Sequence, residues 1–80
     1  MITSGLLLTL EPGHLDDVSS VLRRDPRVEI GDPVSNRLPL VLHTEDEREG
    51  EAVTAALRER AGVAWVDVVC VYFEPGEASS

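Results

Sequence analysis

The sequence predicts an α+β domain in which two helices pack on one face of a four-stranded antiparallel sheet. Two observations support this prediction. The chain of 80 residues suffices for one domain, and its apolar patterns follow the order strand, helix, strand, strand, helix, strand. With short right-handed connections, this βαββαβ order gives the ferredoxin-like split βαβ sandwich. We expect that domain over residues 1–74 and a flexible C-terminal tail over residues 75–80.

The first half of the chain begins with a strand over Ile2–Leu10, where large apolar residues alternate with smaller or polar ones. A helix is expected over residues 12–24, because apolar residues recur there every three or four positions and Asp25-Pro26 stops it. Residues 28–30 alternate between apolar and charged, which is typical of a short strand at the edge of a sheet.

The second half starts with a turn over residues 31–37, which is rich in Gly, Asp, Pro, Ser and Asn. A third strand over Leu38–Thr44 follows, and Thr44 with Glu47 has the spacing of a capping box that would start the second helix. Gly62 is well placed to end that helix. In this topology the first and third strands are central, and the second and fourth lie at the edges.

The last predicted strand, Gly62–Phe73, is apolar on both of its faces. Because side chains alternate along a strand, we expect one face to meet the helices through Ala64, Val66, Val68, Cys70 and Tyr72. So short a chain has few elements with which to cover the other face, which would carry Val63, Trp65, Asp67, Val69, Val71 and Phe73.

The core is expected to be aliphatic, because aromatic residues make up only 4% of the chain. Cys70 is the only cysteine, which excludes an internal disulfide, and its apolar surroundings predict a buried and unreactive thiol. The predicted core consists of Leu6, Leu8, Leu10, Leu15, Val18, Leu22, Val28, Ile30, Leu40, Leu42, Val53, Leu57, Val66 and Val68.

The net charge limits the classes of partner. Fifteen acidic residues against seven basic ones give a formal charge of -8, which repels nucleic acid and anionic membranes and favours a cationic partner. An acidic surface that serves only solubility is the simpler interpretation of the same number. We therefore expect no nucleic-acid and no membrane partner.

Patterns that carry chemistry are missing from the sequence. It contains no Cys-x-x-Cys, no glycine-rich phosphate loop, no His-Glu-x-x-His and no nucleophile elbow. His14 and His43 lie far apart in the chain, so solvated or capping roles are the better interpretation. The prediction is a protein without enzymatic activity, cofactor or metal. The apolar run Gly5–Leu10 is short and is not preceded by basic residues, so we expect a cytoplasmic protein without a signal or a membrane span.

The uncovered face of the sheet predicts a binding site for an amphipathic peptide. Asp67 would pair with a cationic side chain of that peptide, and Glu29 on the edge strand beyond would be a weaker partner. The apolar part of the predicted site consists of Leu7, Val41, Trp65, Val69, Val71 and Phe73.

Four stretches of the sequence resemble one family. They are the opening strand Gly-Leu-Leu-Leu at residues 5–8, Asp-Pro-Arg-Val-Glu-Ile at 25–30, Arg-Leu-Pro-Leu-Val-Leu-His-Thr-Glu at 37–45, and Gly-Val-Ala-Trp-Val-Asp-Val-Val-Cys-Val-Tyr-Phe-Glu at 62–74. In order and spacing, the chain resembles the NapD-type chaperones of periplasmic nitrate reductase.

This resemblance implies a small, cytoplasmic, ferredoxin-like chaperone. Its partner would be the twin-arginine signal peptide of a nitrate reductase catalytic subunit precursor. Binding would hold back export until the molybdenum cofactor is in place. The apolar face and the acidic excess of the chain are compatible with such a peptide.

Two other classes of function remain open. A small ligand-binding or dimerising regulatory domain of the ACT or Lrp/AsnC type has the same element order and would use the last strand for self-association. A plain interaction or assembly module is the third class. The chaperone interpretation predicts a monomer or a weak dimer, whereas the regulatory interpretation predicts a tight dimer.

Overall fold

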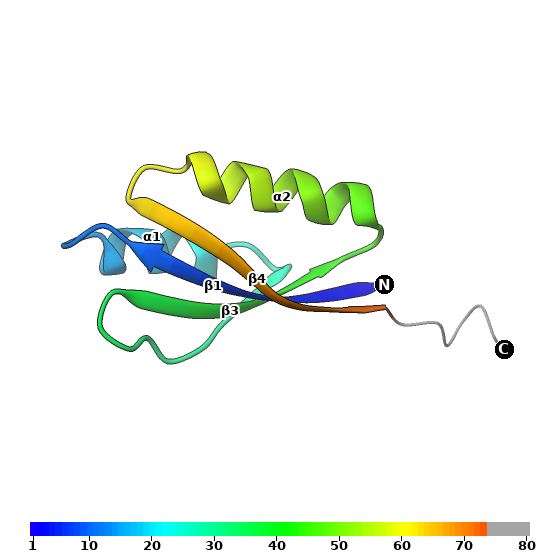
Figure 1. The fold of residues 1–80 in the computed structure, drawn as a ribbon, viewed down its shortest axis with the longest axis horizontal. Helices are drawn as coiled ribbons and strands as arrows, with labels where there is room; N and C mark the ends of the chain where they lie inside the picture. The colour runs from blue at the N-terminus through cyan, green and yellow to red at the C-terminus, as the bar shows by residue number, and fades with distance from the viewer. Residues whose placement is uncertain (74–80) are drawn as a thin grey trace, which may run out of the picture.

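The fold is an α+β sandwich with the predicted element order (Figure 1). The computed structural model describes residues 1–73, so the predicted tail over residues 75–80, and residue 74, lie outside the described part. The elements are β1 (Ile2–Leu10), α1 (Leu15–Arg23), β2 (Val28–Ile30), β3 (Arg37–Thr44), α2 (Glu47–Glu59) and β4 (Val63–Phe73).

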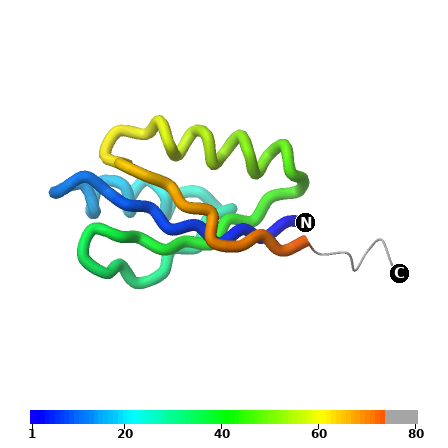
Figure 2. The backbone as a smooth tube through the Cα atoms, viewed as in Figure 1, coloured from blue at the N-terminus to red at the C-terminus, as the bar shows by residue number. Residues whose placement is uncertain are grey.

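The four strands form one sheet in the order β2-β3-β1-β4, and every neighbouring pair is antiparallel. Strands β1 and β3 are therefore central and β2 and β4 are the edges, which confirms the ferredoxin-like prediction. Figure 2 shows the N-terminus beside the end of β4, in agreement with the pairing of Ile2 with Phe73.

The core lies between one face of the sheet and the two helices. Residues at the even positions of β1 and β3 are buried, whereas the odd positions between them are only half-buried. Leu8 and Leu38 sit opposite each other in the register and are completely buried. Val18 and Leu22 of α1 and Leu57 of α2 belong to the same cluster, so both helices cover this one face.

The predicted core is confirmed with one exception. Leu15, Ile30 and Val53 are partly buried against the core, and the other predicted residues are buried. Val68 is 47% exposed, because its part of β4 lies beside a groove rather than under a large side chain of α2.

Helix α2 starts two residues later than the capping-box pattern predicts. Its N-cap is Asp46, whose carboxylate accepts a hydrogen bond of 2.8 Å from the backbone N–H of Glu49. The carboxylate of Glu49 in turn accepts from the backbone N–H of Glu45 at 2.8 Å. Thr44 cannot serve as the cap because it still belongs to β3, where it pairs with Ile2. The reciprocal capping chemistry is present, shifted along the chain.

An arginine clamp ties the loop before β2 to the start of α2. The guanidinium of Arg27 donates to both carboxylate oxygens of Asp25, at 3.0 and 2.9 Å, and to Glu49 at 2.9 Å. The hydrogen bonds from the side chain and backbone of Arg27 lower the pKa of Asp25. The backbone N–H of Glu45, and then Arg27, lower the pKa of Glu49. The clamp thus favours the ionised form of both acids.

We predict that Leu8→Ala destabilises the fold by about 2–5 kcal/mol, because it leaves a cavity in a fully buried position. Leu7→Ala is the matched control, since Leu7 is the next residue of β1 but only half-buried on the opposite face. Urea unfolding of both variants measures the difference. Equal losses at the two positions would contradict the assignment of the two faces.

The arginine clamp predicts a loss of stability in acid. Folding lowers the pKa of Asp25 and Glu49 below the ordinary value of about 4. Their contribution is therefore present above about pH 4 and is lost as the pH falls through the folded-state pKa values. Arg27→Gln should lower the free energy of unfolding at pH 7 and change it less at pH 3, as measured by urea unfolding. The control is Arg24→Gln, at the exposed end of α1. An effect of Arg27→Gln on the free energy of unfolding that is equal at both pH values would refute the prediction.

A further prediction concerns Thr44, which is 3% exposed. Among the described residues, its hydroxyl oxygen is buried without a hydrogen-bond partner. Replacing such a hydroxyl by an apolar group of the same shape removes an uncompensated desolvation cost. Thr44→Val should therefore leave stability unchanged or raise it by up to about 1 kcal/mol in urea unfolding. A clear loss of stability would show that the hydroxyl has a partner in solution.

Candidate peptide-binding surface

The open face of the sheet is the face that the two helices do not cover. Two irregularities in β4 decide which of its side chains reach this face. Along β1 the register runs from Leu6 paired with Val68 to Gly5 paired with Cys70, which leaves Val69 as an extra residue. A second shift near the start of β4 leaves Ala64 as an extra residue between Val63 and Trp65. Each extra residue interrupts the alternation of side chains along the strand.

The predicted faces of β4 are correct between the two extra residues, Ala64 and Val69, and wrong on either side of them. Residues directly opposite each other in an antiparallel pair lie on the same face. Trp65 and Asp67 pair with Thr9 and Leu7 and therefore lie on the open face. Beyond Val69, Cys70 and Tyr72 take the open face, because they pair with Gly5 and Thr3.

Val71 and Phe73, expected on the open face, lie on the helix-covered face instead. They pair with Ser4 and Ile2, both of which are buried there. The expectation assumed uninterrupted alternation, which the extra residue Val69 breaks. Val69 itself has no partner on β1 and is 67% exposed.

Two further assignments on β4 need correction for the same reason. Val63, expected on the open face, is buried opposite Leu10. Cys70, expected to be buried, is exposed. A Cβ added at Gly5 would lie 2.8 Å from the Cys70 sulfur, so the thiol sits over the glycine and needs it to be small.

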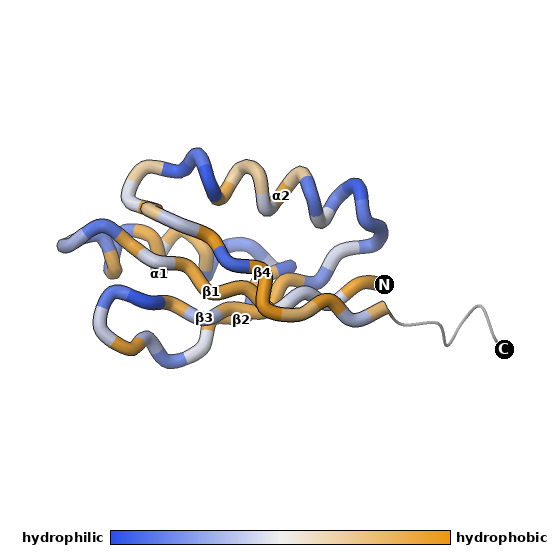
Figure 3. Tube along the Cα trace, in the orientation of Figure 1, coloured by the Kyte–Doolittle hydropathy of each residue, from blue (hydrophilic) through white to orange (hydrophobic). Residues whose placement is uncertain are grey.

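The open face has an apolar middle. Leu7 and Val41 are half-buried there, and Gly5 lies between Val41 and Cys70. Figure 3 shows apolar residues along β1 and along the second half of β4. Cross-strand neighbours define four rows on this face: Arg37–Thr9–Trp65, Pro39–Leu7–Asp67, Glu29–Val41–Gly5–Cys70 and His43–Thr3–Tyr72.

Polar contacts border this apolar middle on the β4 side and at the end of the face that Thr3 and His43 form. On β4, the indole N–H of Trp65 donates to Asp67 at 2.8 Å, and the Trp65 side chain is largely exposed. Toward β2, the His43 ring contacts Glu29 through Nε2 at 2.9 Å and the Thr3 hydroxyl through Nδ1 at 3.2 Å. The arrangement is an apolar strip with an acidic side chain on each side.

The two acids predicted to meet a cationic partner do not lie together. Glu29 is on β2 and Asp67 is on β4, at opposite edges of the sheet. Three strand spacings separate these edges, which corresponds to about 14 Å. One basic side chain therefore cannot contact both acids.

Residues 1–73 offer no group of three or more His, Cys, Asp and Glu side chains that could hold a metal ion. None of the helices in this part of the chain is long and apolar enough to cross a membrane. Comparisons with protein-family models, with curated proteins and with solved structures found no match.

Proposed function

We propose that the protein is a cytoplasmic chaperone that binds the twin-arginine signal peptide of a nitrate reductase catalytic subunit precursor and delays its export during maturation. The observation that carries the proposal is the open face, an apolar strip with Trp65 and Asp67 at the β4 edge and Glu29 at the β2 edge. The sequence resemblance to NapD-type chaperones supplies the identity of the client.

The dimensions of the open face suit a peptide in a helical conformation. The two edges lie about 14 Å apart, and an α-helix with its side chains is about 10–12 Å wide. A helix lying along the strands would rest on Leu7, Val41 and Gly5, with Trp65 as a wall on one side. From Thr9 to Thr3 the open face is about 20 Å long, which matches roughly 13 helical residues.

The charges favour a basic ligand. The formal charge of -8 attracts cationic peptides over a distance. Asp67 uses one oxygen to accept the indole N–H of Trp65, and its other oxygen can accept a guanidinium N–H. Because Glu29 lies at the far edge, two consecutive arginines would engage different sides of the strip, or only one of them would form a close pair.

We predict that Trp65→Ala weakens binding of a synthetic twin-arginine signal peptide by roughly tenfold or more, since buried aromatic anchors dominate such interfaces. Asp67→Asn should have a smaller effect that shrinks with added salt, as expected of a pair at an exposed rim. Isothermal titration calorimetry at two salt concentrations measures both effects. Val71→Ala is the control, because Val71 lies on the same strand but the other face.

The surface itself is tested by amide chemical shifts during titration with the same peptide. Shifts are expected at Thr3–Thr9, at residues 39–43 and at Trp65–Asp67. Shifts confined to α1 and α2 would refute the proposed surface. Equal affinity for a peptide in which both arginines are replaced by glutamate would refute the class of partner. A tight dimer in light scattering would instead favour a regulatory domain.

A further inference from the structure

Strand β4 presents a second surface, separate from the open face. It runs for 11 residues at the edge of the sheet, and its outer edge pairs with no other strand of the described residues. On its helix-covered side, Val68 and Val71 are each 47% exposed and Phe73 is 52% exposed. Long exposed edges with apolar side chains are templates for the addition of another strand.

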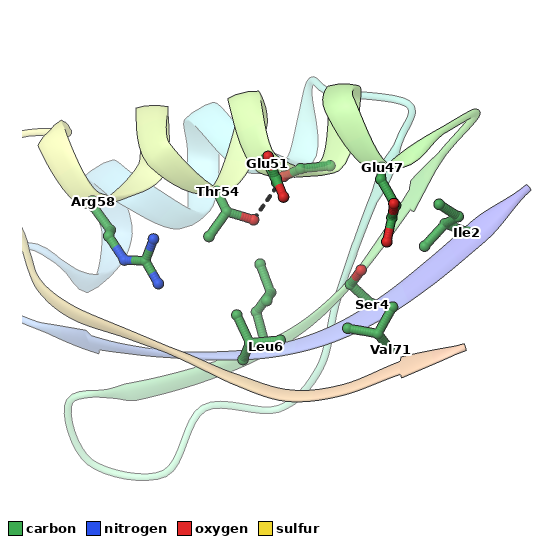
Figure 4. A pocket seen from close by; sticks show the side chains of 10 residues that line it. Ile2, Ser4, Leu6, Glu47, Glu51, Thr54, Arg58 and Val71 are labelled. Carbon is green, nitrogen blue, oxygen red and sulfur yellow. Dashed lines mark hydrogen bonds between the residues drawn. The ribbon is translucent and has the colours of Figure 1, made fainter. Parts of the chain in front are cut away.

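A groove beside this edge opens beneath α2, from Glu47 to Arg58, with a volume of about 260 Å³ (Figure 4). Its floor consists of Leu6 from β1 and Val68 and Val71 from β4, together with Ile2 and Ser4. The groove exists because Gly50 and Thr54, the residues of α2 that face it between the charged ones, carry no large apolar side chain. Gly50 has none, and Thr54 turns its hydroxyl to the Gly50 carbonyl at 2.8 Å.

The rim of the groove has a charge pattern. Glu47 stands at the end nearer Ile2, Ser4 and Val71, Glu51 stands nearer the middle, and Arg58 stands at the other end (Figure 4). The rim carries two carboxylates and one guanidinium, and the whole chain has a formal charge of -8. These charges favour an occupant with basic side chains at the end next to Val71.

We infer that the edge of β4 accepts an extended segment of a basic protein, which adds as a fifth strand. Its backbone would pair with β4, and every second side chain, if apolar, would enter the groove on Val68 and Val71. A basic residue at one end would lie next to Glu47 and Glu51. A second copy of this chain fits less well, because it would bring another charge of -8 to the same edge. This inference does not rest on the proposed chaperone function.

The probe is a synthetic peptide, acetyl-Lys-Arg-Val-Ser-Val-Ser-Val-amide, titrated into the full chain and followed by amide chemical shifts. Shifts are expected along β4 and at Leu6 and Thr54. The same peptide is also prepared in two N-methylated forms, one methylated at the odd-numbered residues and the other at the even-numbered residues. Methylation along the edge that faces β4 removes the donors needed for pairing, so one of the two forms should lose binding at least tenfold.

Matched variants test the groove and its rim. Val71→Asp should weaken binding of the probe peptide at least tenfold. Val34→Asp changes a valine that is 73% exposed outside the groove, and it should leave binding of the probe peptide unchanged. Val71→Thr retains the shape of valine and serves as the milder variant if Val71→Asp unfolds the chain. Replacing Glu47 and Glu51 together by Gln should weaken binding severalfold at low salt and less at high salt.

The outcomes separate this surface from the open face. Trp65→Ala should leave the affinity for the probe peptide unchanged, and Val71→Asp should leave the affinity for the twin-arginine peptide unchanged. Equal binding of all three peptide forms, or shifts on the open face alone, would overturn strand addition at β4. A dimer in light scattering whose β4 amides are protected from hydrogen exchange would also overturn it, because a second copy would then occupy the edge.

Discussion

The structure depends on the burial of one leucine-rich face of the central strands. Leu6, Leu8 and Leu10 of β1 lie against Leu38, Leu40 and Leu42 of β3, and all six are buried. Two helices of 9 and 13 residues can cover this face but not the other. The open face therefore follows from the size of the chain, because so short a domain buries only about 60% of the surface that its unfolded form exposes.

The path of β4 divides its apolar residues between two surfaces. The extra residue Val69 moves Cys70 and Tyr72 to the open face and Val71 and Phe73 to the helix side. Without that bulge, all of the apolar residues from Val69 onward would have kept the faces that simple alternation assigns. One inserted residue thus gives this edge strand an exposed apolar margin on both sides of the sheet.

The sequence predicted β1 and β3 well because their two faces differ in polarity and size. In β4 nearly every residue is apolar, so a shift by one position exchanges a valine for a valine and leaves no trace in the hydropathy pattern. Trp65 and Asp67 were placed correctly because they precede the bulge at Val69. Gly5 was the one available hint, since a glycine within a strand often marks a bulge or a close approach. The cap of α2 was misplaced because Thr44 and Asp46 both precede a glutamate by three residues.

The two surfaces of β4 are adjacent, which gives them a physical relationship. A strand added at the edge would widen the sheet by about 4.8 Å on the side of Trp65 and Asp67. The side chains of the added strand that lie on the open face would stand next to the apolar strip, and they would extend the wall that Trp65 forms. An extended segment at the edge and a helical segment on the open face would therefore favour each other's binding, as consecutive parts of one basic chain could do.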